Sequence, residues 1–405
     1  MTSKGHRKAE LIVLLGAVTA FAPVSIDMYL PALPALGTEF GASAGHVQLS
    51  VASFFLGLAV GQGFYGPLSD RFGRTRPLYA GLLLFVLASI GCALAPSIDF
   101  LIAVRFFQAL GACSGQVISR AVVRDLFESR EAVQVYSLLV LVMGVSPVLA
   151  PLLGGQILQF FPWRTIFWVI ATLGAAGLAG SLVRLKETHR GERKPLILSG
   201  VMRTYGDLLR DRAFLGYVLT GGMAMAGMFA YIVGSPYVFI EHFNVTTERF
   251  GLFFGVNALG LVLAAQLNAR LVRHFSSDAI IRKVLAVQVV SGIVLLLGAW
   301  TGFLQLYGVA TLLFVYVSSV GCLFPNITAM AMAAQGARAG SASALIGVIQ
   351  FALAAASASL IGTTKSGAAI PVAVLIGVCS VSAAVVYWAM IYNTRAQAGG
   401  RVPAR

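Results

Sequence analysis

Twelve long apolar runs constrain this chain more than any other feature of its sequence. Each run is long enough to cross a bilayer as a helix, which takes about 20 mostly apolar residues. Only 11% of the residues are charged, against about 25% in soluble proteins, so most of the surface must face lipid. The sequence therefore predicts an all-α polytopic membrane protein. The predicted spans are residues 11–35, 46–68, 77–95, 99–122, 132–159, 163–185, 213–240, 248–272, 280–300, 304–333, 340–362 and 369–392.

The basic residues predict how these spans are oriented. If the N-terminus and every second connection lie in the cytoplasm, that side holds 25 of the Lys and Arg residues. The opposite side holds only Arg164, Arg249 and Lys365. Cytoplasmic loops carry such an excess, so both termini are predicted to be cytoplasmic. The net charge of +14 is explained in this way, and no basic helix or reader motif indicates nucleic-acid binding.

The longest polar connection divides the chain into halves. It covers residues 187–212 and separates six spans in residues 1–186 from six in residues 213–405. A short internal repeat supports this division, because residues 68–72 after the second span align with residues 271–275 after the eighth. Two repeated halves are a common plan of transporters, with the binding site near the middle of the membrane.

Asp27 is the only carboxylate that lies well inside an apolar run. Placing a charge at membrane depth costs about 2.5–3.5 kcal/mol on insertion scales, so such a residue indicates a functional site. Arg105 lies in the fourth span at a similar predicted depth. Buried groups of opposite charge usually pair or line a cavity. The alternative for Arg105 is an arginine that reaches outward to the lipid headgroups.

The connection between the second and third spans, residues 66–77, has an unusual composition. It contains Gly66, Asp70, Arg71, Gly73 and Arg74. The orientation of the chain explains the arginines but not the acid or the glycines. Gly66 permits close helix approach, and Gly73 permits a tight reversal. A structured latch is favoured over a plain turn.

The fifth span contains two prolines followed by two glycines. Pro147 and Pro151 each remove a helix hydrogen bond, while Gly154 and Gly155 allow close packing. The result is either a bent structural helix or a helix whose shape helps to gate a pathway.

Several polar and aromatic side chains are candidates to line a central cavity, although such residues also pack helix against helix. The candidates are Tyr29, Gln108, Tyr231 and Asn257.

Other classes of function find little support in the sequence. There is no phosphate-binding Gly-Lys-Ser/Thr loop, no zinc pattern and no nucleophile–base pair within the spans. No cofactor, metal or catalytic residue is therefore expected. A sensor or scaffold that transports nothing remains an alternative that no residue favours.

Taken together, the segments resemble the signature motifs of the major facilitator superfamily. The resemblance rests on residues 25–34 around Asp27, residues 66–77, residues 105–111 and residues 144–155. The set is similar to the twelve-span drug:proton antiporters, and within them to the bicyclomycin/chloramphenicol resistance branch.

The resemblance implies a fold of two pseudo-symmetric six-helix bundles in a bacterial inner membrane. It implies a monomer that exports small amphiphilic drugs, such as phenicol-like or bicyclomycin-like compounds, by alternating access driven by the proton gradient. An exporter of a small metabolite such as an amino acid, with incidental drug efflux, is the alternative.

The resemblance also implies roles for individual residues. Asp27 would be the acid coupled to proton and substrate, and Arg105 would couple protonation to the conformational switch. Asp70, together with Asp125 and Arg338, would latch the outward-open state.

Two positions depart from the family pattern. Ala150 stands where the pattern usually has Gly before Pro151, a small change that is expected to be tolerated. Arg273 occupies the position in the second half that corresponds to Asp70, so no second latch acid is implied there.

Overall fold

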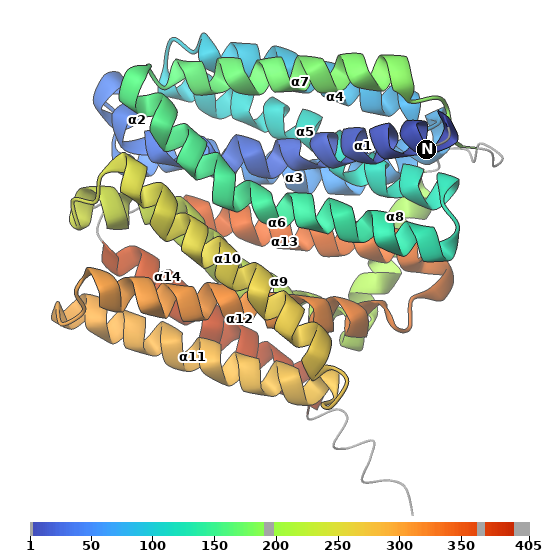
Figure 1. Cartoon of the computed structure of the whole chain (residues 1–405). Coiled ribbons are helices and arrows are strands. Elements are labelled where there is room, and N and C mark those ends of the chain that lie inside the picture. Colours follow the sequence, from blue (N-terminus) through green and yellow to red (C-terminus); the bar gives the residue numbers. More distant parts are fainter. Residues whose placement is uncertain (1–2, 190–197, 363–368, 393–405) are drawn as a thin grey trace, which may run out of the picture. The chain divides into compact units, whose positions relative to one another are not determined.

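The computed structural model describes residues 3–189, 198–362 and 369–392, and every element assigned in these ranges is helical (Figure 1). Twelve helical segments are long and apolar enough to cross a membrane, which confirms the predicted number of spans. The first half contains α1 (Ser3–Asp27), η1 (Leu30–Ala32), α2 (Leu33–Phe40), α3 (Ala44–Phe72), α4 (Thr75–Ala93), α5 (Ile98–Leu126), α6 (Ser129–Phe160) and α7 (Arg164–Arg184). The second half contains α8 (Leu198–Arg210), α9 (Arg212–Pro236), η2 (Tyr237–His242), α10 (Thr247–Leu271), α11 (Ser277–Thr301), α12 (Leu306–Met332), η3 (Gly336–Arg338), α13 (Ala339–Gly362), α14 (Ala369–Tyr387) and η4 (Trp388–Tyr392).

Internal contacts divide the chain into two compact units. Unit 1 comprises residues 1–197 and 244–255, and unit 2 comprises residues 198–243 and 256–405. The first six spans thus lie in unit 1. Helix α8, from the long polar connection, groups with unit 2, and the start of α10 groups with unit 1.

Unit 1 is built around α5, which packs against α3, α4 and α1, while α7 packs on α4 and α6 packs on α1. Glycines on α5 make this close packing possible. A Cβ on Gly111 would lie 2.5 Å from the Phe85 nitrogen in α4, and one on Gly115 would overlap the Val18 carbonyl in α1. Helices in lipid associate through such close backbone contacts, because the hydrophobic effect does not drive apolar side chains together in an apolar solvent.

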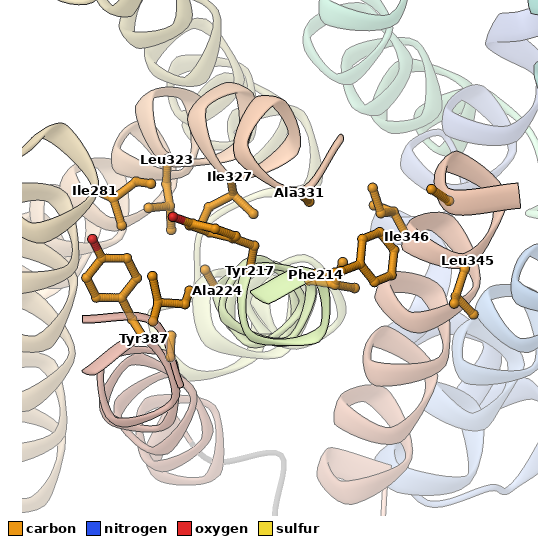
Figure 2. Close-up of a cluster of buried hydrophobic side chains, with 14 of the residues drawn as sticks. Phe214, Tyr217, Ala224, Ile281, Leu323, Ile327, Ala331, Leu345, Ile346 and Tyr387 are labelled. Carbon is orange, nitrogen blue, oxygen red and sulfur yellow. The ribbon is translucent and has the colours of Figure 1, made fainter. Parts of the chain in front are cut away.

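Unit 2 is built around α9, which packs against α12, α13 and α14. Figure 2 shows the buried cluster at one end of this helix, where Phe214 and Tyr217 of α9 meet Ile327 of α12 and Ile346 of α13. Leu208 of α8 is also fully buried in this cluster, so the helix from the polar connection is anchored to unit 2.

The first span is not one continuous helix, although the sequence was interpreted as a single run. Helix α1 ends at Asp27, a 3₁₀ turn follows, and α2 begins at Leu33. The physical reason is the pair of prolines, because Pro31 has no amide hydrogen to donate to the Asp27 carbonyl. Pro34 likewise has none for the carbonyl of Leu30. The break therefore places the buried acid at the end of a half-helix.

Gly57 and Gly66 of α3 offer a direct test of the close packing on α5. A Cβ on Gly57 would overlap the carbonyl oxygen of Phe106, whereas a Cβ on Gly66 would meet no atom within 4 Å. We expect Gly57→Ala to destabilise the protein by about 1–3 kcal/mol through overpacking. Gly66→Ala should leave thermal stability unchanged or raise it, because alanine favours a helix. Thermal unfolding in detergent measures both, and equal shifts would contradict the packing argument.

Candidate functional site

The Asp27 side chain lies at the broken end of α1 and is only 4% exposed. Within the described residues, no hydrogen bond or ion pair reaches its carboxylate. The neighbouring backbone is tightly confined, since Gly154 of α6 packs directly on the carbonyl oxygen of Met28. A buried acid without a fixed partner, at the end of a half-helix, is the arrangement in which transporters handle protons and small ions.

The Arg105 side chain is fully buried in unit 1 and points toward the end of α1. Its Nη1 donates to the Ser25 carbonyl at 3.0 Å and to Gln108 Oε1 at 2.7 Å. The guanidinium carbon lies 4.1 Å from the Phe54 ring centroid and 4.7 Å from that of Tyr29. Such cation–π contacts partly replace the lost hydration of the charge. Because the side chain is 0% exposed, the alternative of an arginine that reaches the headgroups is wrong.

Tyr29 and Gln108, two of the cavity candidates, surround this arginine. Both side chains are fully buried. The Tyr29 hydroxyl is hydrogen-bonded to Ser50 Oγ at 2.8 Å, and Gln108 Nε2 donates to Ser89 Oγ at 2.9 Å. These polar contacts fix the groups that hold Arg105.

Among the described residues, no hydrogen bond or ion pair joins Arg105 to Asp27, and Arg105 instead binds the backbone two residues earlier, at Ser25. The hydrogen bonds of Arg105 go to Ser25 and Gln108, and its Nε and Nη2 are buried without a partner in the described residues. Buried charged donors normally have acceptors, and leaving one unpaired is costly. An acceptor that arrives during function would remove this cost.

The prolines of the fifth span lie within one continuous helix, α6. Pro151, Gly154 and Gly155 are buried, and Pro147 is partly buried. The contact between Gly154 and the Met28 carbonyl links this helix to the residue that follows Asp27.

The other two cavity candidates bind each other in unit 2. Asn257 Nδ2 of α10 donates to the Tyr231 hydroxyl of α9 at 2.7 Å, and both side chains are buried. Their contact joins two spans of the second half.

Most of the segment 66–77 is helical, because α3 extends to Phe72 and α4 begins at Thr75. Only two residues connect these helices. Gly73 has a φ of +86°, which a residue with a side chain rarely adopts. The close helix approach expected at Gly66 is not found among the described residues.

Arg74 organises the charges at this turn, and its side chain is 3% exposed. Its Nη1 lies 2.6 Å from Asp70 Oδ1, and its Nε lies 2.8 Å from Asp125 Oδ2 at the end of α5. The same Nη1 donates to Ser69 Oγ at 2.9 Å. The turn between α3 and α4 is thus linked to α5 by a buried guanidinium between two acids.

Two further residues of the expected latch are exposed in their own units. Arg71 is exposed and stacks over Phe72, with 5.3 Å from its guanidinium carbon to the ring centroid. Arg338 is exposed in η3 of unit 2.

Sequence reasoning missed Glu187, which follows α7 and binds the same turn. Its Oε1 accepts from the amides of Arg74, Thr188 and His189, each at 2.9 Å. Its Oε2 accepts from the Thr75 hydroxyl at 2.9 Å and from the Thr75 amide at 3.3 Å. The sequence analysis gave no signal for this residue, since it is one acid in a polar connection more than a hundred positions from Arg74 and Thr75.

A twelve-span helical fold with a buried acid at a helix break is typical of membrane transporters. The chain belongs to the Major Facilitator Superfamily, whose model matches residues 15–359. It is therefore a multi-pass protein of a bacterial inner membrane, as its bacterial relatives also indicate.

Named relatives cover most of the chain. An uncharacterized MFS-type transporter of Bacillus subtilis, YdgK, is 37% identical over 85% of this chain and 86% of its own length. A bicyclomycin resistance protein homolog of Haemophilus influenzae is 32% identical over 84% of this chain and 85% of its own length. The multidrug resistance protein MdtL of Escherichia coli is 33% identical over 58% of this chain and 59% of its own length.

Solved structures share the fold. A bacterial homolog of the human lysosomal transporter Spinster has a TM-score of 0.75 and 14% identity over the full length of both chains. A D-xylose–proton symporter has a TM-score of 0.75 and 16% identity over 94% of this chain and 97% of its own.

The Glu187 contacts predict how the turn responds to acid. Partial burial by itself would raise the pKa of Glu187, but hydrogen bonds from Arg74, His189 and Thr75 outweigh it and lower the pKa from 4.5 to about 2. A lowered folded-state pKa stabilises the folded turn above about pH 4.5, and this contribution is lost as the pH falls toward 2. Hydrogen exchange at the Arg74 and Thr75 amides, corrected for intrinsic rates, should therefore accelerate in that window.

Glu187→Gln is the control for this prediction, because the amide cannot titrate. The variant should exchange faster than the parent at neutral pH and show a smaller change between pH 4.5 and 2. An identical acid response in both proteins would mean that other carboxylates open the turn.

Proposed function

We propose that this protein exports small amphiphilic drugs from the cytoplasm in exchange for protons. The observation that carries the proposal is the buried Asp27 carboxylate at the end of a half-helix whose Ser25 carbonyl accepts from the buried Arg105. The names of the bicyclomycin-resistance and multidrug-resistance relatives support a drug-like cargo.

Proton exchange follows from competition at Asp27. An ionised carboxylate in a low-dielectric site is costly unless a cation, a donor or a substrate group compensates it. A proton and a bound substrate each remove that cost, so each disfavours the other. When the site faces the two sides of the membrane alternately, this mutual exclusion becomes antiport.

Arg105 couples the charge of Asp27 to the shape of the site. Its Nε and Nη2 have no described acceptor, and its Nη1 already binds the Ser25 carbonyl two residues before Asp27. On this proposal, the Asp27 carboxylate becomes an acceptor for these donors once it loses its proton and the end of α1 moves toward Arg105. A shift of hydrogen bonds from the backbone to the carboxylate would move the broken end of α1. Protonation would reverse the shift.

The finer features of the transporter follow from the same proposal. Both termini lie in the cytoplasm, as the distribution of Lys and Arg supports. The halves 1–186 and 213–405 form the two bundles of an alternating-access cycle that needs no cofactor, and the protein acts as a monomer. The cluster of Asp70 and Asp125 around Arg74 supports a cytoplasmic latch, which Arg338 of unit 2 completes in the outward-open state.

Asp27→Asn tests the proposal. The amide keeps the size of the side chain but cannot release a proton, so we expect pH-driven drug export into inverted vesicles to be abolished while the protein still inserts. Asp207→Asn, which alters an exposed acid of α8, should export normally. Full pH-driven export by the Asp27 variant would refute the mechanism.

The cargo is tested separately with a panel of compounds. Substrate-triggered proton release from the purified protein should follow phenicol-like and bicyclomycin-like drugs and fail with Asp27→Asn. Release by amino acids or similar metabolites alone would favour the metabolite exporter as the natural function.

Arg105→Lys tests the coupling role. Lysine keeps the charge but lacks the Nε and Nη2 donors and the flat guanidinium that lies over the Phe54 and Tyr29 rings. We expect pH-driven export to fall by about tenfold or more, since one charge-assisted hydrogen bond is worth about 1.5–3 kcal/mol. Arg210→Lys, at the exposed end of α8, is the control. Equal export by both variants would show that charge alone suffices.

A further inference from the structure

We propose that Glu187 is a positioning residue of the gate: it clamps the turn between α3 and α4 to the end of α7, and thereby holds Arg74 between Asp70 and Asp125. The assignment of a gate rests on the proposed transport function. The clamp itself rests on five hydrogen bonds to one carboxylate.

The clamp meets a specific need of α4. The first amides of a helix have no partner within the helix, and their positive end favours an anion. The N-cap residue of α4 is Arg74, whose own side chain makes no capping hydrogen bond. Glu187 supplies the missing acceptor to the Arg74 and Thr75 amides from a distant part of the sequence.

The absence of a side chain at Gly73 leaves room for the Glu187 carboxylate. A Cβ on Gly73 would overlap Glu187 Oε2, and its φ of +86° also disfavours any other residue. The glycine of the turn and the acid after α7 therefore fit each other. A tight reversal alone would explain the φ but not the space that the carboxylate occupies.

The clamp reaches the charge cluster through the backbone of Arg74. Glu187 binds the Arg74 amide, and the Arg74 side chain binds Asp70 and Asp125. The next residue, Thr188, adds a weaker contact from its hydroxyl to Asp125 Oδ2 at 3.4 Å. The ends of α3, α5 and α7 and the start of α4 are thus joined in one network.

A second contact fastens the same two helices. The Tyr79 hydroxyl of α4 lies 2.8 Å from the Leu185 carbonyl and 3.2 Å from the Ser181 carbonyl, both at the end of α7. The start of α4 is therefore bound to the end of α7 at two places. Of these two described contacts, the one at Glu187 also involves Arg74.

Two roles of Glu187, positioning Arg74 and merely capping α4, predict different effects on the end of α3 when Glu187 is removed. If Glu187 only caps α4, its removal disturbs the amides that it binds. If it also positions Arg74, its removal loosens residues 66–72 as well, because Asp70 and Ser69 lose a fixed partner. Hydrogen exchange on the full-length protein in lipid nanodiscs separates these outcomes without any substrate or proton gradient.

The experiment compares Glu187→Ala, Arg74→Gln, the double variant and a control, Glu128→Ala. Glu128 is an exposed N-cap acid of α6 whose side chain makes no capping hydrogen bond. We expect Glu187→Ala to speed exchange about tenfold or more at its bound amides and in residues 66–72. In the Arg74→Gln background it should add nothing at residues 66–72, and Glu128→Ala should match the parent.

The proposal would be overturned if Glu187→Ala left exchange in residues 66–72 unchanged. It would also be overturned if the effects of Glu187→Ala and Arg74→Gln in these residues were additive. A transport assay of the same variants is informative only if the parent protein exports a drug. Glu187→Ala should then lower the maximal export rate with little change in apparent KM, and Glu187→Gln, which keeps one acceptor oxygen, should lie between. A parent that exports nothing would refute the proposed function but leave the exchange result intact.

Discussion

The absence of hydrogen-bond partners in the hydrocarbon core is the constraint on which this structure depends. Every backbone amide and carbonyl within the bilayer must find its hydrogen-bond partner in the protein. A chain of apolar runs meets this demand by folding each run into a helix. Polar side chains are subject to the same demand. Asn257 binds Tyr231, Asn326 binds Asn268 at 2.7 Å, and Gln62 binds Gln116 at 2.8 Å, each pair joining two different spans. Departures from full satisfaction are therefore informative.

The main departure lies at the end of α1. Pro31 leaves the Asp27 carbonyl without a helical donor, and the Asp27 carboxylate has no described partner. Arg105, which binds the Ser25 carbonyl of the same helix, keeps two nitrogens without a described acceptor. Aromatic rings and Gln108 hold the arginine in place without neutralising it. In the proposed mechanism, a fixed cation and an acid whose charge can change together couple protonation to conformation.

In each unit, a carboxylate ties the first turn of one span to neighbouring spans, but the donors differ. In unit 1, Glu187 ties the start of α4, the third span, to the end of α7, the sixth. In unit 2, Asp278 in the first turn of α11 accepts from Tyr217 at 3.2 Å and from Tyr387 at 3.1 Å, and so ties the ninth span to the seventh and twelfth. The first contact is a carboxylate that accepts from helix amides, and the second is a carboxylate that accepts from two tyrosine hydroxyls.

The sequence by itself determined the twelve spans, their family and the position of the buried acid, because hydropathy and a costly intramembrane charge are local properties that need no tertiary information. It also indicated that Asp27 and Arg105 lie at similar depth. Only the tertiary structure decided that Arg105 binds the Ser25 carbonyl rather than Asp27, that Gly66 makes no close contact while Gly57 does, and that Glu187 caps α4. These facts depend on which helix faces pack together, and the apolar sequences of the spans carry little information about that choice.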